Sequence, residues 1–449
     1  MGDRSKNVEQ RNPEMTTPFT QLDAVLNILL VVTIIVLFAS RLRVPYTIIL
    51  IFAGLFVHLY PRFPILNISP DLFISLLLPP ILFEETLKLN VEGLIEDSDF
   101  ILSNAIAGTL IMVVAVALFA YFLSGFTFLE AFLLGVIIAP TDPVTVIATF
   151  RRLGVLKRFE LIVAGESLLN DGVAIVVYTT LVSAISLGVI TPLSILRISL
   201  VSVLGGIFIG LIGGHIVHII FCWTDDKFVQ VLLSFISAFG IFRTAEGIGA
   251  SGVIATVLTG LIINYRCRRY GGISEESMEM LEALWEFVGF TASSIAFIFI
   301  GMYLDPTLLM KFLFPVFLLT IFILWARYWM VDIIAETIKF FNKKDMPDTW
   351  RIGVCWSGLR GAISIVLVLG VSTLHLPNAE EMTALTYGVV LATNMIQGLT
   401  MPIMVRGLSL STDRIKLTPL EEEIEQSSPI KIDQEIEIDQ EKQIEQEDH

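Results

Sequence analysis

Charged residues are scarce in this chain of 449 residues: Asp, Glu, Lys and Arg make up 16% of it, whereas apolar residues make up 55%. Soluble domains carry about 25% charged residues, so the composition excludes an ordinary soluble protein and indicates a polytopic membrane protein. The formal net charge of −15 is uneven, because residues 421–449 hold twelve acidic residues against two lysines. The acidity therefore belongs mainly to a tail and says nothing about a site in the apolar part.

Cysteine is scarcer still, with three residues, Cys222, Cys267 and Cys355, and no CxxC or Cys/His spacing. Neither a metal cluster nor a disulfide framework is predicted, and no cofactor or nucleic-acid partner is expected. The first twenty residues lack the basic region, apolar core and small-residue cleavage site of a signal peptide, so we expect the first membrane span to insert uncleaved.

Apolar runs are abundant, and a helix needs roughly 17 to 25 residues to cross a bilayer core of about 30 Å. The sequence predicts thirteen spans, at about 22–40, 44–60, 70–87, 100–123, 128–149, 160–185, 195–221, 228–242, 247–264, 282–304, 308–334, 351–373 and 383–407. The eighth is short, and the segment 243–247 leaves open a kink within one longer element.

The basic residues between these spans favour one orientation. Eighteen Lys or Arg follow odd-numbered spans and four follow even-numbered ones, and basic loops stay in the cytoplasm. We therefore predict a multi-pass protein of the cell membrane with its N-terminus outside and its C-terminus inside. Its parts are an external segment at 1–20, a transmembrane domain at 21–408 and an acidic, disordered cytoplasmic tail at 409–449, which has too little apolar surface to fold.

Two carboxylates fall inside predicted spans. Asp142 lies in the segment 139–143, Ala-Pro-Thr-Asp-Pro, and Asp171 lies in the segment 165–172, Gly-Glu-Ser-Leu-Leu-Asn-Asp-Gly. A charge at membrane depth costs about 2.5 to 3.5 kcal/mol on insertion scales, so such residues mark ion or proton pathways. The prolines around Asp142 predict a break in the fifth span, because proline removes a backbone donor and disfavours helical geometry before it. The alternative is that Asp142 only caps the second half-helix.

Ser167 and Asp171 are four residues apart and share a helical face, while Glu166 and Asn170 share a neighbouring face. Carboxylate and hydroxyl oxygens bind hard cations such as sodium, and a carboxylate also accepts a proton. Because one group holds one ion at a time, the pattern predicts competition between a cation and a proton. The alternative for Asp171 is a structural carboxylate paired with an arginine.

Arg327 and Arg360 also lie in predicted spans, and neither is expected to stay unpaired in lipid. Glu166 is the natural partner for at least one of them, since this would keep a fixed positive charge away from Asp171. Glu84 follows Pro79 and Pro80 near the end of the third span. It is either a residue of the membrane interface or part of the ion path.

These motifs, together with Gly-Leu-Arg-Gly-Ala at 358–362, resemble the NhaP/NHE branch of the monovalent cation/proton antiporters over about residues 20–408. The resemblance implies an all-α fold of thirteen helices with two inverted six-helix repeats, broken helices crossing near the midplane, and a homodimer. It implies electroneutral exchange of one Na⁺ for one H⁺, because Asn170 stands where the electrogenic branch has an aspartate, and K⁺ or Li⁺ are the alternative cations.

The resemblance also assigns residues. Asp171 would carry cation and proton, and Asp142, Ser167 and Thr141 would complete the Na⁺ site, with Asn170 and Glu84 beside it. Glu166, Arg327 and Arg360 would form a buried ion pair. A passive cation channel also needs oxygen-lined polar residues but no proton carrier. An intramembrane hydrolase with an aspartate dyad is disfavoured by the residues flanking Asp142 and Asp171.

Overall fold

The computed structural model describes residues 45–59, 70–123, 125–186, 191–371 and 376–410, together with Leu26, residues 29–35, Leu37 and Leu374. The predicted external segment, most of the predicted first span and the tail beyond Leu410 lie outside the described residues. Every regular element in the described ranges is helical, which confirms the all-α class.

The first half of the chain forms α2 (Tyr46–Leu59), α3 (Pro70–Lys88), α4 (Val91–Glu96), α5 (Ser98–Leu102), a π-helical turn η1 (Ser103–Gly108), α6 (Thr109–Leu123), α7 (Phe128–Ile138), α8 (Val144–Leu153), α9 (Lys157–Ser186) and α10 (Pro192–Phe221). The second half forms α11 (Lys227–Gly247), α12 (Gly252–Tyr270), α13 (Glu275–Tyr303), α14 (Pro306–Lys311), α15 (Leu313–Asn342), α16 (Asp348–Trp356), α17 (Ala362–Val371), α18 (Ala379–Thr393), a π-helical turn η3 (Asn394–Gly398) and α19 (Leu399–Gly407).

Seven continuous helical stretches in the described residues are long and apolar enough to cross a membrane, and three shorter apolar helices accompany them. The predicted boundary between the eighth and ninth spans is wrong. Helix α11 continues through residues 243–247, and the turn comes after it, where Gly249 has a φ of +77°. Ser251 then accepts a hydrogen bond from the Ile254 N–H and is the N-cap of α12. Gly249 and Ser251 therefore set the turn, and the charged residues Arg243 and Glu246 do not interrupt α11.

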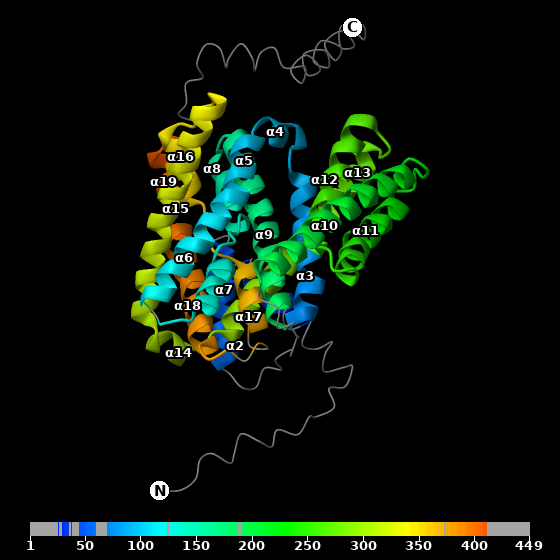
Figure 1. Ribbon diagram of the computed structural model, residues 1–449. Coiled ribbons are helices and arrows are strands. Elements are labelled where there is room, and N and C mark those ends of the chain that lie inside the picture. The colour runs from blue at the N-terminus through cyan, green and yellow to red at the C-terminus, as the bar shows by residue number, and fades with distance from the viewer. Residues whose placement is uncertain are drawn as a thin grey trace.

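Most helix contacts fall within two groups, and Figure 1 shows α10 and α12 of the first group beside α6, α15 and α18 of the second. In one group α10 packs on α12, α12 on α3, and α13 on α2 and α3. In the other, α6 packs on α7, α15 on α18 and α17 on α18. Helix α9 contacts α7 in the second group and α10 in the first, so it lies between them.

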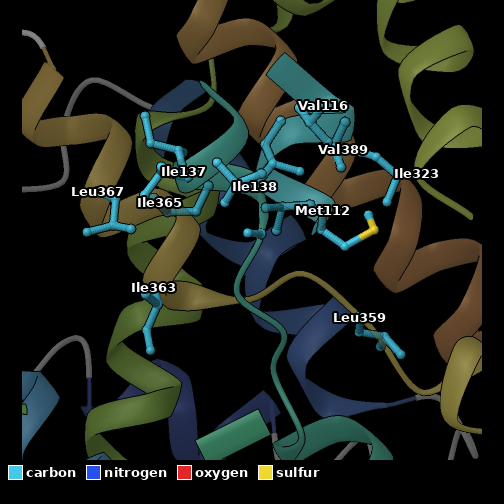
Figure 2. Close-up of a cluster of buried hydrophobic side chains, with 14 of the residues drawn as sticks. Met112, Val116, Ile137, Ile138, Ile323, Leu359, Ile363, Ile365, Leu367 and Val389 are labelled. Carbon is cyan, nitrogen blue, oxygen red and sulfur yellow. The ribbon is translucent and has the colours of Figure 1, made fainter. Parts of the chain in front are cut away.

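Two apolar helices stop partway and restart. Residues 139–143 separate α7 from α8, and residues 357–361 separate α16 from α17. Buried side chains from α6, α7, α15, α17 and α18 surround this region, among them Met112, Ile138, Ile323, Ile365 and Val389 (Figure 2). These apolar side chains pack against one another in one buried cluster and position the two interruptions within the second group of helices.

Candidate functional site

The first interruption follows from local sequence. Helix α7 begins with a capping box, in which Thr127 accepts from the Glu130 N–H and Glu130 accepts from the Thr127 N–H. It ends before Pro140, and Pro143 precedes the first residue of α8. Asp142 Oδ1 accepts a hydrogen bond from the Val144 N–H at 2.9 Å. The predicted break is therefore present. Pro143 is the N-cap residue of α8, and Asp142 accepts from the first N–H of this half-helix with one oxygen, which leaves its other oxygen for a further role.

The two interruptions cross through their main chains. The Asp142 N–H donates to the Leu359 carbonyl at 2.8 Å. A Cβ on Gly361 would collide with the Asp142 carboxyl group, so glycine is required for this approach. Extended backbone at membrane depth is tolerated only where protein covers it, and each interruption covers the other here.

Helix α9 holds the first interruption at Thr141. The Asn170 Nδ2 donates to Thr141 Oγ1 at 2.7 Å, the Thr141 N–H donates to Asn170 Oδ1 at 3.4 Å, and the Ser167 hydroxyl donates to the Thr141 carbonyl. All three residues are buried. Ser167 and Asn170, predicted as ion ligands, thus contact the backbone and side chain of Thr141 and position the break.

Asp171 lies one residue beyond this contact and lines a cavity of about 30 Å³ together with Asp142 and Thr141. Its Oδ1 is buried and accepts no hydrogen bond from the described residues. A cavity needs only about 10 to 15 Å³ of such volume to hold one water-sized species, so this one has room for a single small ion. The two carboxylates that the sequence singled out therefore share one small cavity.

The sequence did not single out three further oxygen-bearing residues of this cavity, Glu85, Ser293 and Ser364. Glu85 Oε2 and Ser364 Oγ are buried and have no hydrogen-bond partner among the described residues. The sequence motifs point to Glu84 rather than to its neighbour Glu85. Adjacent residues on a helix point about 100° apart, and the sequence does not say which of the two faces the cavity. The two serines carry no sequence signal that separates them from ordinary small residues of a membrane helix.

Glu84 lies elsewhere, which corrects its predicted place beside Asp171. It lines a larger cavity of about 1000 Å³, and its Oε1 is 2.6 Å from Lys88 Nζ. We call this larger cavity the vestibule. It shares Glu85, Pro143, Val144 and Ser293 with the small cavity, so the two cavities adjoin at Glu85.

Glu166 and Arg327 form the buried ion pair that the sequence suggested. Arg327 Nη2 lies 3.0 Å from both carboxylate oxygens of Glu166, and both side chains are 3% exposed. The same nitrogen donates to the Val354 carbonyl at 3.2 Å. A Cβ on Gly358 would collide with the guanidinium group, which ties this pair to the second interruption.

Arg360 does not join that ion pair, contrary to the prediction. It is fully buried, and its Nη1 donates to the carbonyls of Ala139 and Pro140. These carbonyls lie at the C-terminal end of α7, where the helix dipole is negative. Free backbone acceptors of the broken helix therefore take the place of a carboxylate as the partner of Arg360.

These observations define a class of protein. Carboxylates and hydroxyls are the oxygen ligands that hard monovalent cations prefer, and here they surround a small buried cavity at the crossing of two broken membrane helices. In the described residues, no three His, Cys, Asp or Glu side chains are grouped closely enough to hold a metal ion, so a cation here would need hydroxyl or backbone oxygens besides the carboxylates. Interrupted helices around such a site are the architecture of secondary ion transporters.

The chain belongs to the sodium/hydrogen exchanger family, whose transmembrane model matches residues 28–407. This confirms the family resemblance stated from the motifs, and members of this family are transporters rather than enzymes.

Relatives and solved structures agree with the family. The chain is 32% identical to the Na⁺/H⁺ antiporter ApNhaP of Aphanothece halophytica, over 87% of this chain and 74% of the relative. It is 30% identical to the Na⁺/H⁺ antiporter NhaH of Halobacillus aidingensis, over 87% and 99%. The structure of the sodium proton antiporter MjNhaP1 from Methanocaldococcus jannaschii matches with a TM-score of 0.70 at 18% identity, over 86% of this chain and 99% of that chain. At this identity the last match shows the fold, that of a membrane antiporter.

Proposed function

We propose that this protein exchanges Na⁺ for H⁺ across the cell membrane and that both ions bind at Asp171. The observation that carries the proposal is the buried, unpartnered Asp171 Oδ1 in a cavity shared with Asp142 and Glu85. The names of the antiporter relatives support the choice of ions. A charge buried without a partner is costly, so Asp171 requires either a cation or a proton, and the two compete.

The ligands that we propose for Na⁺ are Asp171 and Asp142 with hydroxyl oxygens of the same cavity, whose lining also includes Glu85. Thr141 lines this cavity, while Ser167 and Asn170 hold it in place. Because protons compete with the cation, the apparent KM for Na⁺ should rise as pH falls. We propose one cation per proton, with Asp171 as the carrier and the neutral Asn170 beside it, and alternating access of one site would move both ions.

The transport geometry is part of the same proposal. We propose that the vestibule opens to the cytoplasm, because it carries the basic side chains Lys88, Arg151, Lys157 and Arg158 and basic residues favour that side. The C-terminus would then be cytoplasmic and the N-terminus external. Thirteen spans in two inverted repeats, with α7/α8 and α16/α17 as corresponding broken helices, fit this arrangement.

We further propose that the protein works as a homodimer in the lipid membrane. The apolar span within α10 has only 17% of its residues buried inside one chain. Leu196, Leu204 and Phe208 are among its exposed apolar side chains. Such a surface fits either lipid or a second copy of the chain, and cross-linking of cysteines introduced along α10 would separate these two cases.

The decisive experiment is exchange in proteoliposomes, followed with a pH-sensitive dye, with Na⁺, Li⁺ and K⁺ offered in turn. The wild-type protein should couple Na⁺ movement to opposite H⁺ movement, and Asp171→Asn should abolish this while the protein inserts normally. Asp348→Asn is a matched control, because Asp348 is 92% exposed. Cation flux without counterflow of protons would identify a channel instead, and full exchange by Asp171→Asn would remove the assignment.

A further inference from the structure

An internal ammonium group bridges two helices in the vestibule. Lys88 Nζ lies 2.6 Å from Glu84 Oε1 on its own helix α3 and 2.9 Å from Glu286 Oε1 on α13. Glu84 and Lys88 are four residues apart and share one helical face. Their side chains are 15% and 24% exposed, so the contact is partly shielded from water and stronger than an ordinary surface pair.

The Glu84 side chain packs closely against Gly289 of α13. A Cβ on Gly289 would lie 2.8 Å from Glu84 Cβ and 2.9 Å from Glu84 Cγ, which is closer than real Cβ atoms approach. Glycine at this position of α13 therefore makes room for Glu84 against the helix. The carboxylate is fixed in the vestibule wall and presents its Oε1 to Lys88.

Two other basic side chains of the vestibule, Arg151 and Arg158, have partners away from Glu84. Arg151 Nε is 2.8 Å from Glu160, and Arg158 Nη2 is 2.7 Å from Asp97. Lys88 differs because its partner Glu84 adjoins Glu85 in sequence, and Glu85 lines both the vestibule and the small cavity. A cation that passes from the vestibule toward Asp171 through this shared wall moves past the Lys88 ammonium.

We propose that Lys88 is a tethered cation that competes with the transported cation in the vestibule and thereby sets the apparent affinity for Na⁺. The inference rests on the proposed function. An ammonium ion carries the same charge as Na⁺ and binds the same carboxylate oxygens. While Lys88 holds Glu84 and Glu286, it denies both carboxylates to an incoming ion, and its charge lowers the local concentration of free cations.

The effect on affinity should be moderate and should depend on salt. One unit charge beside the path, at the intermediate dielectric of a water-filled vestibule, changes cation occupancy about threefold to tenfold. Raising the ionic strength with an inert organic salt shortens the Debye length to a few ångströms at about 1 M. The difference between variants should then shrink, which a purely structural role of Lys88 would not produce.

The test measures the KM and maximal rate for Na⁺ in everted membrane vesicles. Lys88→Gln should lower KM about threefold to tenfold at an unchanged maximal rate, and Lys88→Arg should restore the wild-type KM. Glu286→Gln should raise KM, because it removes negative charge and leaves Lys88 in place. Arg269→Gln is the matched control. Arg269 is 55% exposed, pairs with Glu92 and lies outside the vestibule lining, so removing its positive charge should leave KM unchanged.

Two results would overturn the inference: an equal change in KM for Lys88→Gln and Lys88→Arg, or a lower maximal rate of Lys88→Gln at constant KM. Either would mean that Lys88 only ties α3 to α13. A wild-type protein that exchanges no Na⁺ for H⁺ would instead refute the proposed function, so the two failures are distinguishable in the same assay.

Discussion

Breaking the buried Glu166–Arg327 pair should destabilise the protein far more than breaking a surface pair. In Glu166→Gln the Arg327 guanidinium loses both of its 3.0 Å carboxylate contacts and keeps the weaker bond to the Val354 carbonyl. Both side chains are 3% exposed, so water does not replace the lost partner. Removing one member of such a pair costs about 3 to 5 kcal/mol, because the other charge stays buried and unpaired.

The exposed pair between Arg269 and Glu92 is the internal comparison. Its atoms are also 3.0 Å apart, but the side chains are 55% and 64% exposed, and such pairs contribute about 0 to 1 kcal/mol. Because the two distances are equal, burial alone predicts that Glu166→Gln lowers the free energy of unfolding severalfold more than Glu92→Gln does. Replacing Glu166 and Arg327 together by methionine should cost less than the sum of the single changes, because no charge is stranded.

The assay is equilibrium unfolding in detergent micelles, with tryptophan fluorescence as the readout. It compares Glu166→Gln with Glu92→Gln, and Glu166→Met and Arg327→Met with the variant that carries both methionines. The reasoning is refuted if Glu166→Gln is no more destabilised than Glu92→Gln. It is equally refuted if the loss of unfolding free energy in the double variant equals the sum of the losses in Glu166→Met and Arg327→Met, because the two side chains would then not stabilise each other.

Three further predictions concern the crossing and its carboxylates. Glu85→Gln should raise the KM for Na⁺ about tenfold by removing a negative charge from the lining of the small cavity, and Glu84→Gln should have the smaller effect in the same exchange assay. Gly361→Ala should abolish exchange and lower the yield of folded protein, since the added Cβ collides with Asp142. Gly407→Ala should behave as wild type in both measurements, because an added Cβ there meets no described atom within 4 Å outside its own helical turn. With the neutral Asn170 in place, an imposed membrane potential should leave the exchange rate unchanged, and a rate that follows the potential would contradict one-for-one exchange.

The sequence located the break at Asp142 and the carboxylate at Asp171 because both are signalled by residue types that are rare in membrane helices. Pro140 and Pro143 flank Asp142 and leave the backbone there without two N–H donors, whereas Pro79 and Pro80 lie within the continuous helix α3, so a proline pair alone does not predict a break. An aspartate in an apolar run is costly at membrane depth and therefore indicates a function. The pairing of Glu166 with an arginine followed from the same argument, since a buried charge requires a partner.

The partners across the fold were less predictable. Arg360 was expected beside a carboxylate, but the crossing brings carbonyls of Ala139 and Pro140 to it, and backbone acceptors carry no side-chain signal. Glu84 and Glu85 are chemically equivalent in the sequence, and only the rotation of α3 decides which one faces Asp171. Ser167 and Asn170 have the right chemistry for ion ligands, but their distance to Thr141 depends on how α9 packs against the break.

The main-chain contact between Asp142 and Leu359 bears on how this protein could be re-engineered. A scaffold held by a peptide N–H and a peptide carbonyl does not depend on which side chain stands at position 359, provided that it fills the same apolar space. Ser293 and Ser364 contribute oxygens to the small cavity without supporting the crossing. Alkali-metal preference could therefore be tuned by enlarging or shrinking these two serines, while the framework around them remains intact.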